Sequence, residues 1–93
     1  MVKFKVVRLC RQEAMSIVPT EVVRYDLDKA AELLSGAGYQ VDNQGLMIIA
    51  RGGGKEITLY ASGRIMLSGV GSKEEAKRLA EATYAVVEPS REV

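Results

Sequence analysis

The run with the clearest chemical potential places three glycines between two cations, Arg51-Gly52-Gly53-Gly54-Lys55. Glycine-rich backbone leaves N–H groups free to bind an anion, so this run offers a phosphate cradle between two positive charges. It is not a Walker A loop, because the pattern GxxxxGK[ST] is absent. Glycines mark turns far more often than ligand sites, and a hairpin turn is the favoured interpretation.

Basic side chains elsewhere offer further phosphate contacts, although the formal net charge of the whole chain is only +1. The first twelve positions carry Lys3, Lys5, Arg8 and Arg11 and no acidic residue, so the positive charge is concentrated at this end. Phosphate contacts would make binding weaker as salt rises. Lysines that protect a sheet edge from aggregation explain Lys3 and Lys5 equally well. The candidate phosphate-binding residues are Lys3, Lys5, Arg11, Arg51 and Arg64.

Several classes of chemistry are excluded by composition. The chain has no histidine and a single cysteine, which excludes histidine-based catalysis, His/Cys metal sites and an internal disulfide. Cys10 shares a strand face with Phe4 and Val6 and is expected to be a small buried hydrophobe. No pair of carboxylates is placed for acid–base work beside a nucleophile. We therefore expect no active site, no metal and no cofactor.

Length and hydropathy indicate one domain spanning residues 1–93, with 47% apolar and 27% charged residues. No stretch is long and apolar enough for a membrane span, and the N-terminus lacks the apolar segment of a signal peptide. With one unpaired thiol, the expected location is the cytoplasm. A core this small is marginally stable, which favours self-association.

The pattern of apolar residues predicts strands and two helices in the order β-α-(three or four β)-α. Strands are expected over residues 2–11, 46–50, 56–61 and 64–69, the last two forming a hairpin through Ser62-Gly63. Residues 12–25 add a strand, a dimer arm or only a loop. A helix is expected to start at Asp26, and a second at the capping box Ser72-Lys-Glu-Glu75, ending before Pro89.

Both helices are expected on one face of an antiparallel sheet, because Ile57, Leu59, Ile65 and Leu67 need cover that nothing else in the chain provides. The opposite face is then open. It is expected to display Thr58, Tyr60, Met66 and Ser68, with Leu46 and Ile48. An open face with apolar and aromatic groups normally binds a partner.

Part of the sequence resembles a known family. Residues 26–88 are similar to one repeat of the TATA-box-binding protein (TBP). DLDKAAELLSGAGYQVDNQGLMIIAR resembles its helix followed by PGL-I-Y-R, and LYASGRIMLSGVGSKEEAKRLAEATYAVV resembles I-F-x-SGK-x-x-x-TGAKS-x-E-x-A and its helix. Residues 50–63 resemble the substrate-binding N-terminal domain of type three ribonuclease H about equally.

The resemblance implies an α+β, TBP-like β-α-β4-α fold whose concave sheet lies on the DNA minor groove as one half of a saddle. With one repeat, a saddle requires a homodimer joined through the first strands. Tyr60 matches a phenylalanine that wedges between base steps, and Leu46 matches the leucine of PGL. Asn43 stands where the other wedge phenylalanine belongs. Met66 and Ser68 match floor positions, and Arg51 and Arg64 match basic ones.

The sequence therefore predicts a non-enzymatic protein that binds nucleic acid, DNA or an RNA–DNA hybrid, through its open sheet face as a homodimer. The alternative is a protein-interaction or small-ligand module that uses the same fold without DNA, which the near-neutral charge favours. The residues expected to contact nucleic acid are Lys3, Lys5, Leu46, Ile48, Arg51, Thr58, Tyr60, Arg64, Met66 and Ser68.

Overall fold

The main element of the fold is a six-stranded antiparallel sheet. The computed structural model describes residues 3–8 and 14–92. The strands of the sheet are β1 (Phe4–Arg8), β2 (Ala14–Pro19), β4 (Gln40–Asn43), β5 (Met47–Gly52), β6 (Lys55–Tyr60) and β7 (Ile65–Ser68). They lie in the order β1-β2-β7-β6-β5-β4. Two short strands, β3 (Arg24–Tyr25) and β8 (Arg91–Glu92), pair separately. The predicted hairpin of β6 and β7 is confirmed.

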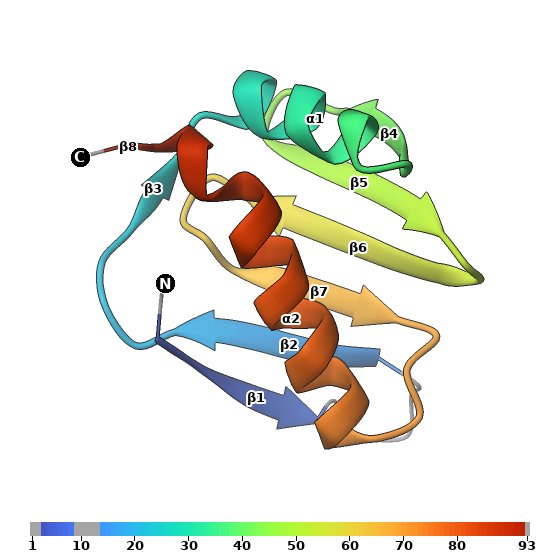
Figure 1. The fold of residues 1–93 in the computed structure, drawn as a ribbon. Helices are drawn as coiled ribbons and strands as arrows, with labels where there is room; N and C mark the ends of the chain where they lie inside the picture. The colour runs from blue at the N-terminus through green and yellow to red at the C-terminus, as the bar shows by residue number, and fades with distance from the viewer. Residues whose placement is uncertain (1–2, 9–13, 93) are drawn as a thin grey trace.

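Two helices cover one face of this sheet, as Figure 1 shows. These are α1 (Leu27–Gly36) and α2 (Lys73–Val87), the latter followed by the 3-10 turn η1 (Glu88–Ser90). In Figure 1, α1 lies over the β4–β5 end, and α2 crosses the sheet diagonally in front of β6, β7 and β2. The expected α+β arrangement, with both helices on the same face, is therefore confirmed.

Side-chain capping explains where both helices begin. The carboxylate of Asp26 accepts hydrogen bonds from the N–H groups of Asp28 and Lys29, at 3.1 and 3.3 Å. The Ser72 hydroxyl accepts the N–H of Glu75 at 3.1 Å. The Glu75 carboxylate does not complete the expected capping box. It lies 2.7 Å from Lys55 Nζ and accepts the N–H of Gly71, and these two bonds lower the pKa of Glu75.

The segment left open over residues 12–25 contributes two strands. β2 lies between β1 and β7, with Val6 opposite Ile17 on one side and Met15 opposite Leu67 on the other. The expected first strand is therefore β1, at the sheet edge, and the strand next to the predicted hairpin is β2. Cys10 and Arg11 lie outside the described residues.

The core lies between the sheet and the helices. Every second residue of the inner strands is buried, including Ile17, Ile57, Leu59, Ile65 and Leu67. From α2 the buried side chains are Ala76, Ala80, Thr83, Tyr84 and Val87, whereas Leu79 is half-buried. The rings of Tyr25 and Tyr84 stack in this core with centroids 6.3 Å apart. Neither tyrosine was among the core residues expected from the sequence.

The glycine-rich run forms the turn between β5 and β6. Gly53 and Gly54 have φ angles of +59° and +78°, a left-handed conformation at two successive positions that glycine adopts without strain. Gly52 and Lys55 flank this turn and pair with each other across the hairpin. The interpretation as a hairpin turn is confirmed.

Candidate nucleic-acid interface

The face of the sheet away from the helices is built from the alternate residues that the helices do not cover. Strand register aligns these residues in rows across the sheet. The middle row runs Asp42, Ile49, Thr58, Met66, Ser16 and Val7 from β4 to β1. We call the whole surface the open face. Thr58, Tyr60, Met66 and Ser68 lie on it, as the alternation predicts.

Two apolar residues expected on this face lie elsewhere. Ile48 is fully buried beneath the helices, opposite Leu59, so its expected exposure is wrong. The reason is strand parity: Ile48 and Ala50 share the core side of β5, which turns Met47 and Ile49 to the open face. Leu46 precedes β5 and is 84% exposed, in the loop rather than within the sheet.

The two cations of the glycine-rich run are bound to carboxylates. Arg51 Nε lies 3.3 Å from Glu56 Oε2 on the open face. Lys55 Nζ lies 2.7 Å from Glu75 Oε1 on the helix side. Each carboxylate offsets the charge that a phosphate would need, so this turn is a poor phosphate cradle.

Charge on the open face is divided between its two halves. Over β4, β5 and β6 the face carries Asp42, Arg51 and Glu56, one cation against two acids. Over β1, β2 and β7 it carries Lys5 and Arg64, and within the described residues neither forms an ion pair with a carboxylate. An anion is therefore attracted to the β1–β2–β7 half and repelled from the other.

Arg64 is held against the sheet by Ser16, a residue not expected at the site from the sequence. Its Nε donates a 3.1 Å hydrogen bond to the hydroxyl of Ser16 on β2. Ser16 is only 1% exposed although it lies on the open face. The bond leaves the two terminal nitrogens of the guanidinium group available to a ligand.

A hollow of about 370 Å³ opens beside this guanidinium group, lined by Tyr60, Ser62, Arg64 and Met66. We call it the Tyr60 hollow. The Tyr60 hydroxyl lies 3.8 Å from the Met66 sulfur. An aromatic ring, a polarisable thioether and a cation thus meet in one depression, a combination that suits a flat, anionic ligand.

The turn that supports the hollow is anchored in the core. Gly63 has a φ angle of +87°, and its N–H donates to the carbonyl of Tyr60 at 2.9 Å. The carbonyl of Gly63 accepts a 2.6 Å hydrogen bond from the buried hydroxyl of Tyr84. A Cβ at position 63 would lie 2.5 Å from Val23 Cγ2, and the positive φ angle adds backbone strain, so this position strongly favours glycine. This packing fixes the strand ends that carry Tyr60 and Arg64.

Ser16 and Val18 lie on the open face but were not expected there, because the sequence does not decide whether residues 12–25 form a strand. Val7 and Met47 also lie on this face, as the pairing of β1 with β2 and of β5 with β6 shows. The apolar residues Met15 and Ile17, two positions apart before Pro19, were the available signal. Lys3 lies just before β1, where its carbonyl accepts the N–H of Thr20, and its side chain is exposed.

No protein-family model matches the sequence, and no curated protein or solved structure matches it significantly. Neither described helix is long and apolar enough to cross a membrane. Over residues 3–8 and 14–92, no three potential metal ligands of the His, Cys, Asp and Glu types lie close enough together to hold an ion. The candidate site is the open face, where the Tyr60 hollow lies beside Arg64.

Proposed function

We propose that this domain is a non-enzymatic nucleic-acid-binding protein of the cytoplasm that uses its open face. The observation that carries the proposal is the Tyr60 hollow with Arg64 beside it, on a sheet face that no described element covers. Aromatic and thioether groups stack on bases, and a guanidinium group pairs with phosphate. Lys5 adds a second cation on the same half of the face.

We further propose a TBP-like arrangement for the fold. Without the edge strand β1 and the two-residue β3, the element order is β2, α1, four strands and α2. This order is the β-α-β4-α order implied by the resemblance and supports it. A saddle built from two such domains requires a homodimer, and the outer edge of β1 is the surface proposed to join the copies.

The experiment is a titration of fluorescently labelled duplex DNA, single-stranded DNA and RNA–DNA hybrid at low and at physiological salt, with the mass of the protein measured alongside. Binding that weakens steeply with salt is expected, because each phosphate contact releases counterions. Absence of binding to all three at low salt would overturn the proposal.

A protein-interaction role is the second candidate. The ion pair between Arg51 and Glu56 removes a cation from the face, and the net charge of +1 provides little general attraction for nucleic acid. The exposed apolar side chains of Val7 and Leu46 also suit a protein partner. Failure of the titration would favour this alternative.

A further inference from the structure

We infer that the Tyr60 hollow binds one unpaired nucleotide, so that the open face prefers single-stranded nucleic acid to a duplex. This inference rests on the proposed function and narrows its substrate. It assigns the base to the ring of Tyr60 and a phosphate to the terminal nitrogens of Arg64.

The size and lining of the hollow support a single flat ring. Its volume of about 370 Å³ lies at the lower end of the range for small-ligand sites, roughly 300–1,000 Å³. Tyr60 and Met66 provide a surface for stacking, and Ser62 at its rim offers a hydroxyl that both donates and accepts hydrogen bonds. A base that remains paired within a duplex would not enter such a depression.

The row of residues beside the hollow provides a path for one backbone. Tyr60 donates its N–H to the carbonyl of Arg64, which places the two residues side by side on β6 and at the start of β7. Continuing the β2–β7 register by one residue sets Val18 beside Arg64, and Val18 pairs with Lys5. The row from Tyr60 to Lys5 therefore crosses three strand spacings, roughly 14 Å. A strand whose base stacks on Tyr60 meets both cations in succession.

The other half of the face disfavours a second phosphate backbone. Asp42 and Glu56 lie there, and Arg51 is held by Glu56. Among the described residues, Tyr60 is the one aromatic side chain of the open face. The other aromatic residues of the described part lie on the helix side: Phe4, Tyr25, Tyr39 and Tyr84. One stacking group beside one cationic path matches one strand rather than two.

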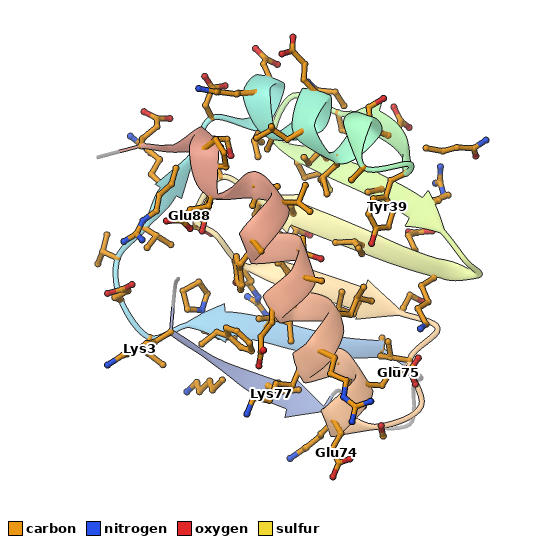
Figure 2. The ribbon with its side chains drawn as sticks, in the orientation of Figure 1. Lys3, Tyr39, Glu74, Glu75, Lys77 and Glu88 are labelled. Carbon is orange, nitrogen blue, oxygen red and sulfur yellow. The ribbon has the colours of Figure 1, made fainter. Side chains whose placement is uncertain are left out.

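The test compares binding of a labelled oligothymidylate, the blunt duplex of the same length and free thymidine monophosphate. The variants are Tyr60→Ala, Tyr60→Phe and Arg64→Gln. The matched control is Lys77→Gln, which removes a charge from the exposed side of α2 on the helix side of the sheet, where Figure 2 labels Lys77. Circular dichroism melting confirms that each variant folds.

Tighter binding of the single strand than of the duplex is expected. Tyr60→Ala should weaken single-strand binding roughly 5- to 150-fold, the effect of losing one stacked base, and Tyr60→Phe should restore it. Arg64→Gln should reduce the slope of log affinity against log salt by roughly 0.7, the value for one phosphate contact on a single strand. Lys77→Gln should change neither quantity.

Two results would overturn the inference and leave the proposed function standing: preference for the duplex, or single-strand binding that Tyr60→Ala leaves unchanged. No binding of any nucleic acid would overturn the proposed function as well. Thymidine monophosphate that competes with the strand, and loses affinity in Tyr60→Ala, would support the hollow as a nucleotide site. A mononucleotide that competes equally well against wild type and Tyr60→Ala would contradict it.

Discussion

The hydroxyl of Tyr84, in the last turn of α2, donates a 2.6 Å hydrogen bond to the carbonyl oxygen of Gly63 in the turn between β6 and β7. This bond joins the helix layer to the strand ends that carry Tyr60 and Arg64. The candidate site on the open face is thus positioned by a contact made on the opposite side of the sheet.

Removing this contact should destabilise the fold. Tyr84→Phe leaves the Gly63 carbonyl buried without a partner, and we expect a loss of about 1–3 kcal/mol in the free energy of unfolding. Urea denaturation followed by circular dichroism measures it. Tyr60→Phe, which removes a hydroxyl from the open face, is the control and should change stability by less than about 0.5 kcal/mol. Equal effects of the two variants would contradict the anchoring role.

Two features favour glycine at position 63: its positive φ angle and the close contact with Val23. Gly45 has only the first of these features, so comparing the two positions distinguishes their costs. Gly45 has nearly the same φ angle as Gly63, +86° against +87°, but a Cβ at position 45 would meet nothing within 4 Å. Gly45→Ala should therefore cost only backbone strain, about 1–2 kcal/mol. Gly63→Ala adds a clash with Val23 and should cost about 1–3 kcal/mol more. Thermal melting of both variants tests this, and similar melting temperatures would show that the turn rearranges without cost.

Stability should fall in alkaline solution because of Tyr25. Burial, followed by the nearby charge of Glu88, raises the pKa of Tyr25 to about 12, and burial also raises the pKa of Tyr84. A phenol is neutral when protonated, so the unfolded chain loses this proton near pH 10 while the folded chain retains it. The contribution of protonated Tyr25 to the free energy of unfolding is therefore fully present below pH 10 and is lost as pH rises from about 10 to 12.

The hydroxyl of Tyr25 provides the control for this pH dependence. It is buried and, within the described structure, has no hydrogen-bond partner. Tyr25→Phe should therefore leave the free energy of unfolding at neutral pH unchanged or raise it by about 1 kcal/mol, because no hydrogen bond is lost. The same variant should flatten the fall between pH 10 and 12. Unfolding in urea across this range measures both effects, and a loss of stability at neutral pH would mean that the hydroxyl has a partner.

Self-association through β1 can be tested at one backbone N–H. The carbonyl of Lys3 accepts a hydrogen bond from the N–H of Thr20, its partner on the β2 side. In an antiparallel pair of strands, every second residue bonds to the neighbouring strand, so Lys5 bonds to β2 and the N–H of Val6 points away from it. Val6→Pro should remove a bond to a second copy without removing one within the sheet, at a stability cost of about 1 kcal/mol. Sedimentation velocity should show a monomer for Val6→Pro and a dimer for Val6→Thr. A dimer in both would place the interface elsewhere.

Local patterns were sufficient to predict the helix starts, the β6–β7 hairpin and the residues that alternate along it. Asp26 and Ser72 cap helices by accepting N–H groups two to three residues away. Buried and exposed residues alternate clearly along β6 and β7, so the core-facing residues can be identified from the sequence: Ile57, Leu59, Ile65 and Leu67. Such features depend on neighbours in sequence, so the sequence contains them.

Tertiary structure alone decided which side of β5 faces the core and where β2 lies. The short run from Leu46 to Ala50 is apolar on both faces, so Ile48 and Ile49 cannot be told apart by hydropathy, and only pairing with Leu59 and Thr58 separates them. The bond from Tyr84 to Gly63 and the one from Arg64 to Ser16 join residues 21 and 48 positions apart. The amino-acid sequence determined the two helix starts, the β6–β7 hairpin and the exposed residues of that hairpin, whereas the candidate site depends on contacts that form only when distant segments pack together.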